Sequence, residues 1–515
     1  MKETEAKYSA PADTALPRLD DLPQVARASG PVEQVLQAEY FDTDDLRLMQ
    51  TGITLRRRTG GSDAGWHLKL PAGNQVRTDI RPPLPGAVRK VPAELADLVR
   101  AYTRGKELGP VATLTTRRRV TTLLTPAGES LAEVADDDVY GNRHGNPTSD
   151  SHWREVGVEL TGGDDRLLSA ADKVLRRNGL KPAGQSAKLE RVLGSQLSPP
   201  RQQAPLDTAA PAYQIVVAYL KEHAEALKAL DPMVRRDEPD SVHKMRVATR
   251  RLRSTLRTFG TIVSGDGTAD LAQELKWLGD LLGAARDVEV QAGRLQRHVD
   301  STDVEQLLGP VQARVQAYFA KARATARADV LTALNSERYD ALLDALDALI
   351  TSPPLGDRAW QPAGLILPAT VDRGYRKMRR RMRRAMHAPV GQPADAALHQ
   401  ARKAAKQARY AAEAATPVLG GPADRFAGKM KKMQSVLGEH HDTVVSRQLE
   451  RKLAISAHAA GEVAFSYGLF FARDARAGQD LAARARTTWQ HAARRRYRRW
   501  TGCLDGAQGH RRNRR

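Results

Sequence analysis

The stretch His243–Arg257 reads HKMRVATRRLRSTLR, and a related stretch at His399–Glu413 reads HQARKAAKQARYAAE. Both fit the pattern H-x2-R-x3-(R/K)-x2-R. A second similarity follows downstream, where LGAARD ends at Asp287 and LGEHHD ends at Asp442, 44 and 43 residues after the respective histidines. Two matching pairs at nearly equal spacing predict a duplicated helical unit.

The basic residues of each stretch fall on one side of a helix, opposite apolar residues such as Met245 and Leu252 in the first and alanines in the second. Solvated helix faces normally mix acidic and basic residues, whereas here like charges recur at i, i+3 and i+7. Such a face repels itself unless an anion is bound. A linear polyanion fits, because successive helical turns can meet successive phosphates. The candidate ligands, with a third basic helix included, are His243, Arg246, Arg250, Arg253, Arg373, Arg376, Arg380, His399, Arg402, Lys406 and Arg409.

The net charge of +21 is concentrated in one part of the chain. Residues 1–200 carry 28 Lys and Arg against 27 Asp and Glu, so the remainder carries 53 against 33. This asymmetry predicts an anionic partner for the C-terminal part. Nucleic acid is the weaker candidate, since aromatic residues make up only 5% and no known nucleic-acid module is visible.

Cysteine content and hydropathy limit the remaining classes. Cys503 is the only cysteine, which excludes an internal disulfide framework and a cysteine metal cluster. We find no secretory signal and no apolar run long enough for a membrane span. We therefore expect a cytoplasmic protein without a membrane partner, concentrated at polyphosphate granules if the polyanion is polyphosphate.

The N-terminal part reads as short strands with charged residues at every second position. Examples are Arg56 and Arg58, Arg117 and Arg119, and Glu155 and Glu159. The opening Glu3-x-Glu5-x-Lys7 and the pair Glu133 and Asp137 follow the same period. These residues form either the solvated faces of a sheet or the charged interior of a closed barrel, in which cations hold phosphates and carboxylates hold a metal.

The C-terminal part resembles the CHAD family, the conserved-histidine α-helical domain, on its two histidine stretches. The resemblance implies two pseudo-symmetric helical bundles around a basic groove that binds inorganic polyphosphate. It adds Lys244 and Lys403 to the ligands named above.

The N-terminal part resembles the CYTH family of triphosphate tunnel metalloenzymes, on the opening ExExK and on SAKLER at 186–191. The resemblance implies an antiparallel eight-stranded tunnel that hydrolyses a triphosphate with Mg²⁺ or Mn²⁺. By this match the metal ligands are Glu3, Glu5, Asp137, Glu155 and Glu159. The phosphate-binding cations are Lys7, Arg56, Arg58, Lys69, Arg117, Arg119 and Lys188. Glu5 and Glu133 are the candidates for a general base. The family often carries a third glutamate in the late strand, where this chain has Gly157.

The expected organisation is therefore α+β and multidomain. A tunnel domain spans residues 1–192, a linker 193–211, a helical domain 212–503 and a basic tail 504–515. The expected activity is a Mg²⁺- or Mn²⁺-dependent triphosphatase acting on tripolyphosphate, joined to a polyphosphate-binding domain. A binding protein with an inactive tunnel stays open as an alternative, as do thiamine triphosphate and nucleotides as substrates.

Overall fold

The computed structural model describes residues 5–61, 63–71, 77–82, 89–145, 150–183, 188–194 and 206–502. The chain divides into two compact units, Met1–Gln202 and Gln203–Arg515. Glu3, most of the expected linker, Cys503 and the expected basic tail lie outside the described residues.

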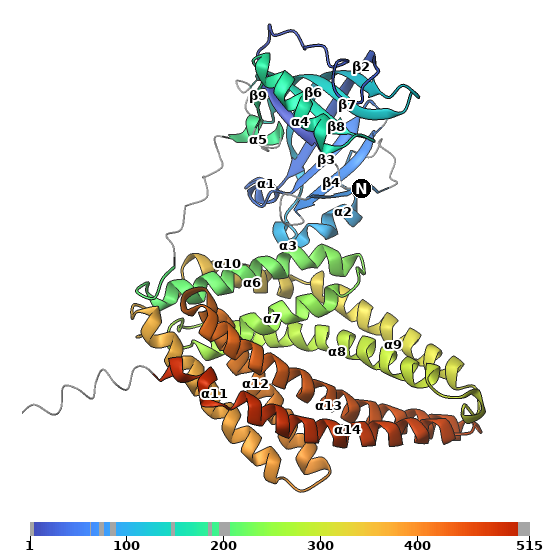
Figure 1. Ribbon diagram of the computed structural model, residues 1–515, viewed down its shortest axis with the longest axis vertical. Coiled ribbons are helices and arrows are strands. Elements are labelled where there is room, and N and C mark those ends of the chain that lie inside the picture. The colour runs from blue at the N-terminus through green and yellow to red at the C-terminus, as the bar shows by residue number, and fades with distance from the viewer. Residues whose placement is uncertain are drawn as a thin grey trace, which may run out of the picture. The chain divides into compact units, whose positions relative to one another are not determined.

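The first unit is built on one antiparallel sheet with helices against it (Figure 1). Its elements are β1 (Glu5–Ala10), β2 (Arg27–Asp42), α1 (Arg47–Gln50), β3 (Thr54–Thr59), β4 (Gly65–Pro71), β5 (Arg77–Ile80), α2 (Ala93–Leu98), α3 (Arg100–Thr103), β6 (Gly109–Leu124), β7 (Ser130–Arg143), β8 (Ser151–Leu160), α4 (Asp165–Arg177), β9 (Lys181–Pro182) and α5 (Lys188–Leu193).

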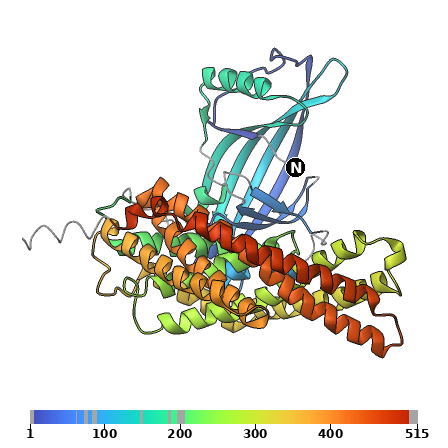
Figure 2. The same ribbon diagram turned by 60° about the horizontal axis from the view of Figure 1, so that its bottom comes forward.

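The strand order is β5-β4-β3-β2-β6-β7-β8-β1-β9. The expectation of a closed eight-stranded barrel needs correction, because the described part of the sheet has nine strands and no pair that joins β5 to β9. Both edge strands are short, so little backbone is available there for closure. Register shifts within β2 at Ser29/Val32 and Tyr40/Phe41 bend this long strand, and the sheet is strongly curved (Figure 2).

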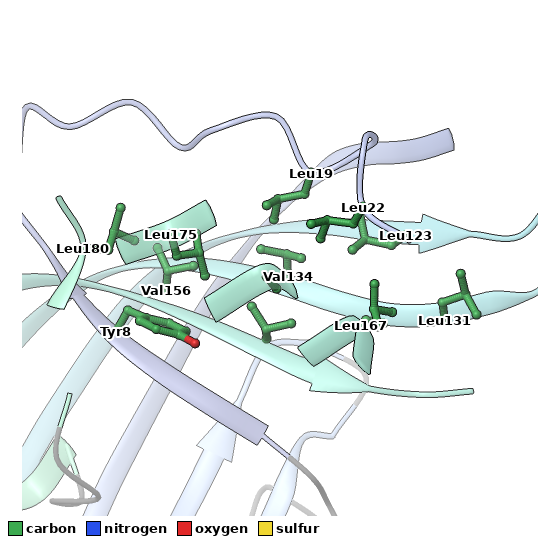
Figure 3. Packing of buried hydrophobic residues seen from close by; sticks show 13 residues of the cluster. Tyr8, Leu19, Leu22, Leu123, Leu131, Val134, Val156, Leu167, Leu175 and Leu180 are labelled. Atoms are coloured by element: carbon green, nitrogen blue, oxygen red, sulfur yellow. The ribbon is translucent and has the colours of Figure 1, made fainter. Parts of the chain in front are cut away.

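Apolar residues cover the outer face of the sheet. Val134, Val156 and Val158 point to this side and pack against Leu167, Ala171 and Leu175 of α4 (Figure 3). Asp164 caps α4 by accepting hydrogen bonds from the backbone amides of Arg166 and Leu167. Because strand side chains alternate, the odd-numbered residues of β7 and β8 face the inner side of the sheet.

The second unit is all helical, as expected from its sequence. Its elements are α6 (Ala212–Arg235), α7 (Ser241–Thr258), α8 (Thr268–Asp300), α9 (Val311–Leu334), α10 (Glu337–Thr351), α11 (Ala363–His387), α12 (Gln392–Leu419), α13 (Gly421–Ala459) and α14 (Phe465–Ala492), with short 3₁₀ helices at Val304–Gln306, Arg495–Tyr497 and Arg499–Thr501. No helix of the described residues is both long and apolar enough to cross a membrane.

The two halves of this unit repeat the same order of helices, α6 to α9 and α11 to α14 (Figure 1). Their first helices begin at a reciprocal backbone contact. The amide of Ala212 donates to the carbonyl of Gln361, and the amide of Ala363 donates to the carbonyl of Ala210, both at 2.9 Å. Equivalent helices also pack across the halves, α7 against α12 and α8 against α13. The duplication in the sequence is therefore a structural repeat, with α10 as an additional helix.

A buried polar network joins α8, α13 and α14. Glu450 and Asp474 are both 0% exposed. Arg294 donates to both oxygens of Asp474, and the His298 Nε2 lies 3.0 Å from Asp474 Oδ1. Ser446 donates to Glu450 Oε1 at 3.0 Å. Burial and the adjacent Asp474 carboxylate raise the pKa of Glu450 well above its ordinary value.

The stability of the helical unit should therefore fall as the pH rises. The unfolded chain releases the Glu450 proton near its ordinary pKa, whereas the raised pKa keeps the proton bound to higher pH in the folded protein. The stabilisation is therefore lost as the pH rises above the ordinary pKa. Glu450→Gln keeps a neutral donor beside Asp474, and we expect it to raise the unfolding free energy by on the order of 2 kcal/mol at about pH 9, with a smaller effect near pH 5. Urea unfolding followed by circular dichroism measures this. A variant less stable than wild type at both pH values would show that Glu450 is ionised in the fold.

Candidate functional site

The inner face of the N-terminal sheet lines a cavity of about 210 Å³. β1 to β4, β6, β8 and α5 all contribute to its wall. Its charged lining residues are Glu5, Lys7, Arg56, Arg58, Asp63, Lys69, Arg81, Arg118, Glu159 and Lys188. The structure thus brings together five of the seven cations expected to bind phosphate: Lys7, Arg56, Arg58, Lys69 and Lys188.

Positive charge dominates one part of this cavity. Burial lowers the pKa of Arg58, and the neighbouring Arg56 lowers it further. Burial alone would raise the pKa of Tyr40, but the cations around it, Arg56 first, bring it below its ordinary value. The Nε atoms of Arg56 and Arg58 are buried and have no hydrogen-bond partner within the part of the chain that the structure describes. This wall therefore holds donors suited to an anion.

The structure places Arg118 of β6 in the cavity, and not Arg117 and Arg119 as predicted. Arg118 lines the cavity, where its Nε and one terminal nitrogen donate to the two oxygens of Asp137 at 2.7 and 2.8 Å. Arg119 donates to Asp136 on the outer face, and Arg117 lies over the exposed ring of Tyr140. In the sequence TTRRRV, either Arg118 or the pair Arg117 and Arg119 could point to the inner face of the sheet. The register with β7, which places Arg118 opposite Asp137, decides between them.

Three glutamates form a row across neighbouring strands. Glu5 of β1 is the register partner of Glu159 of β8, and Glu159 is the partner of Glu133 of β7. Directly opposed side chains in a sheet have Cβ atoms about 5 Å apart, so the three carboxylates face a common region. Glu5 also pairs with Lys7 at 3.1 Å. Carboxylate oxygens are the ligands that Mg²⁺ and Mn²⁺ prefer. The oxygens of this row are not gathered within 4.8 Å of one another; among the described residues, His298, Glu450 and Asp474 are.

The other two expected metal ligands lie in a separate cluster. The Lys188 ammonium lies 2.6 Å from Asp137 Oδ2 and 3.0 Å from Glu155 Oε1. Burial would raise the pKa of Asp137, but Arg118 and Lys188 hold it below its usual value. The Asp137 and Glu155 carboxylates therefore have cationic partners, as the Glu5 carboxylate has in Lys7.

Gly157 lies between these two groups of carboxylates. A Cβ atom at this position would lie 3.1 Å from Glu5 Oε1. The absent side chain therefore leaves room for the Glu5 carboxylate.

Sequence reasoning missed Asp63 and Arg81 as cavity residues. Asp63 lies in the turn before β4, where it pairs with Arg58, and Arg81 lies just beyond β5, where it pairs with Asp79 at 2.8 Å. Neither lies within a strand, so an alternating pattern has no means of finding them.

In the helical unit, four cations from both halves meet between α7 and α12. Arg246 and Arg250 come from α7, and Arg402 and Lys406 from α12; we call these four the central basic cluster. Burial is the first cause that lowers the pKa of Arg246, Arg402 and Lys406. Neighbouring arginines lower each pKa further, and for Arg402 the Asp442 carboxylate partly offsets the effect. The Nε atoms of the three arginines are buried without a hydrogen-bond partner among the described residues.

Glycines in the next helices make room for this cluster. A Cβ atom on Gly283 of α8 would lie 3.3 Å from the Arg246 Nε, and one on the equivalent Gly438 of α13 would lie 3.7 Å from the Arg402 Nε. The glycine of LGAARD and the glycine of LGEHHD therefore have the same packing role, because each leaves room for an arginine of the neighbouring helix. Asp287, four residues after Gly283, lies 3.9 Å from Arg246.

The two histidines occupy equivalent positions beside the central basic cluster. The Nδ1 atoms of His243 and His399 are both buried and have no hydrogen-bond partner in the described chain. Burial and neighbouring cations lower the pKa of both. His399 also lies against His441 of α13, with ring centroids 4.4 Å apart. Sequence reasoning missed His441 because the equivalent residue of the first half is Arg286, not a histidine.

The remaining expected polyphosphate ligands lie outside the cluster. Lys244 and Lys403 are exposed on its flanks. Arg409 is paired with Glu413 at 2.6 Å and with Gln434, whereas its counterpart Arg253 lies near Arg257. Glu413 stands where the first half has Arg257, which explains the difference. On α11, a depression of about 430 Å³ is lined by Ala369, Arg373, Arg376, Arg379 and Arg380.

Comparison with known proteins agrees with this division. A family model of the CYTH domain matches residues 1–188, and one of the CHAD domain matches residues 218–451. The chain is 39% identical over 511 residues to uncharacterized protein Rv2226 of Mycobacterium tuberculosis (strain ATCC 25618 / H37Rv), covering 96% of both chains.

Several solved structures are similar to part of this chain. The CHAD domain of the plant Ricinus communis is 28% identical with a TM-score of 0.47, covering 57% of this chain and 96% of that one. PptA from Streptomyces chartreusis is 20% identical with a TM-score of 0.46, covering 55% and 99%. A Hippeastrum protein, HpAC1, titled as a putative adenylyl cyclase with dominant triphosphatase activity, is 14% identical with a TM-score of 0.25, covering 39% and 100%.

With both domains matched in order and one relative similar over nearly its whole length, the chain belongs to the family of proteins that carry a CYTH domain followed by a CHAD domain.

Proposed function

We propose that this protein binds inorganic polyphosphate with its helical unit and hydrolyses tripolyphosphate, or a related triphosphate, in the cavity of its N-terminal unit. The observation that carries the proposal is the gathering of cations at two places, the central basic cluster and the cavity wall, where Arg56, Arg58 and Arg118 lie. Like charges held close together repel one another, and phosphate oxygens would offset this repulsion.

The geometry of the central basic cluster suits a linear anion better than a compact one. Arg246 and Arg250 lie one helical turn apart on α7, and Arg402 and Lys406 lie one turn apart on α12. One phosphate chain passing between these helices would meet cations from both sides. Arginine offers two parallel donors to each phosphate, which adds orientation to the charge attraction.

In the N-terminal cavity the residues divide into two roles. Arg56, Arg58 and Arg118 would bind the non-bridging oxygens and neutralise the charge that develops on them during phosphoryl transfer. Glu5, Glu159 and Glu133 would hold a Mg²⁺ or Mn²⁺ ion, which when bound supplies Lewis-acid polarisation of a phosphate oxygen. Glu133 is exposed and Glu5 is partly exposed, so either carboxylate is accessible to accept a proton from water.

The placement of Arg118 gives a matched pair of variants. We expect Arg118→Ala to lower kcat/KM for tripolyphosphate by about 10–1,000-fold, because a charged donor to the substrate is lost. Arg117→Ala removes the same charge from the outer face, and we expect a change within about twofold. Phosphate release at saturating Mg²⁺ measures both, with thermal melting as a check on folding. A larger loss of kcat/KM in Arg117→Ala than in Arg118→Ala would show that the outer face of β6, rather than the inner face, binds the substrate.

Removal of one carboxylate of the row should weaken metal dependence. We expect Glu159→Gln to raise the Mg²⁺ concentration needed for half-maximal phosphate release by about tenfold or more, since a neutral amide is a poorer ligand. Glu155→Gln is the control, because Glu155 pairs with Lys188 outside the row. An equal rise in the required Mg²⁺ concentration in both variants would contradict the assignment of Glu5, Glu159 and Glu133 as metal ligands. No metal-dependent release by the wild type, together with tight polyphosphate binding, would establish a binding protein without triphosphatase activity.

The helical unit can be tested independently of hydrolysis. We expect Arg246→Ala with Arg402→Ala to lower polyphosphate affinity by about 100-fold, at roughly 1.5 kcal/mol for each lost charge-assisted contact. The control, Arg323→Ala with Arg486→Ala, removes two exposed arginines of α9 and α14 and should change affinity by less than about twofold. Titration with polyphosphate, repeated with competing DNA at fixed salt, measures affinity and selectivity. Equal losses in both double variants would mean that net charge, not the cluster, drives binding.

A further inference from the structure

Asp63 places a carboxylate among the cations of the N-terminal cavity. It lies in the turn between β3 and β4, and one terminal nitrogen of Arg58 donates a hydrogen bond to it. Both partners are partly buried, with 14% of the Arg58 side chain and 28% of the Asp63 side chain exposed. The carboxylate therefore occupies a guanidinium donor that the cavity would otherwise offer to a bound anion.

The ion pair between Arg118 and Asp137 is arranged differently. Arg118 donates to the two oxygens of Asp137 at 2.7 and 2.8 Å. Of these two residues only Arg118 lines the cavity, and Asp137 is 3% exposed. Asp137 thus supports its arginine from outside the cavity, whereas Asp63 lines the cavity together with Arg58. A carboxylate on the cavity side of a guanidinium group lies where a phosphate oxygen would bind, so the two anions exclude each other.

The turn fixes the backbone of Asp63 but leaves its side chain able to rotate. A Cβ atom on Gly60 would clash with the carbonyl oxygen of Val35, so the turn runs close against β2. The Nε2 atom of the buried His67 lies 2.8 Å from the Asp63 carbonyl oxygen. Because the Asp63 side chain is partly exposed, a change of rotamer can move its carboxylate into water while the backbone stays in place.

The Asp63 carboxylate also reduces the repulsion between neighbouring arginines. Burial and Arg56 lower the pKa of Arg58, and the charge of Asp63 opposes both effects. We propose that Asp63 is an internal competitor for the phosphate position on Arg58: the substrate displaces its carboxylate on binding, and the carboxylate returns to Arg58 as the product leaves. The inference rests on the proposed function of the cavity and adds a residue that sets the affinity of this site for substrate and product.

A competing carboxylate weakens the binding of any anion that uses Arg58. The ion pair must break first, and the displaced carboxylate then remains near the bound negative charge. Asp63→Asn keeps the size of the side chain and removes its charge. We expect this variant to bind tripolyphosphate about fivefold more tightly or better, and to lower the inhibition constant of orthophosphate by a similar factor.

The test combines calorimetry with inhibition kinetics on the full chain. Titration with tripolyphosphate without divalent metal measures binding in the absence of hydrolysis, and the background Arg246→Ala with Arg402→Ala keeps the helical unit from dominating the heat. Product inhibition by orthophosphate is measured at saturating Mg²⁺. The control is Asp45→Asn, which removes a carboxylate paired with Lys106 at 2.9 Å outside the cavity, and we expect a change within about twofold. Thermal melting checks folding, and Asp63→Ser repeats the loss of charge with a smaller side chain.

Arg58→Ala separates competition from general repulsion. If Asp63 acts by occupying Arg58, the gain in affinity from Asp63→Asn shrinks once Arg58 has been removed. An equal gain with and without Arg58 overturns the competition, as does an unchanged affinity in Asp63→Asn. Weaker binding also overturns it, and would show that Asp63 holds Arg58 in position for the substrate. A wild type that neither binds tripolyphosphate in the cavity nor releases phosphate overturns the proposed function of the cavity, and this inference with it.

Discussion

Side chains of like charge repel one another, yet both units of this chain hold several cations on one face. In the helical unit the carboxylates of Asp287 and Asp442 lie near the central basic cluster, and burial raises the pKa of Asp442. In the N-terminal unit Arg56 and Arg58 follow each other on the same face of β3. The apolar packing behind these faces must supply the free energy that keeps the charges together.

That packing differs between the two units in its geometry. In the sheet, alternation sends Val134, Val156 and Val158 outward to the core and leaves the inner face to charged residues. In the helical unit, α12 packs with alanines, and a Cβ atom on Gly374 of α11 would lie 3.2 Å from the Ala408 Cα. Small residues at this contact let α11 and α12 approach closely, so the basic arc of α12 is held in a fixed direction.

The sequence predicted the helical site better than the cavity, for a physical reason. A helix has one periodicity, so the spacing of Arg246, Arg250 and their counterparts determines which residues share a face. A strand has two faces that alternate equally well, and within three consecutive arginines only the register with β7 selects Arg118. Neither the helical nor the strand periodicity could predict contacts between side chains that depend on the fold. Lys188 of α5 pairs with Asp137 of β7, and Arg409 pairs with Glu413.

Gly157 shows why a missing side chain need not mean a missing function. Within β8 the residues on the inner face are Glu155, Gly157 and Glu159. Glu155 pairs with Lys188, whereas Glu159 lies opposite Glu133 of β7. The other glutamates of the inner face, Glu5, Glu159 and Glu133, come from three strands. A glutamate at 157 would crowd Glu5, whose Oε1 already lies 3.1 Å from the Cβ position. The glutamates Glu5, Glu159 and Glu133 lie opposite one another on neighbouring strands, and the glycine beside them leaves more room for the Glu5 carboxylate.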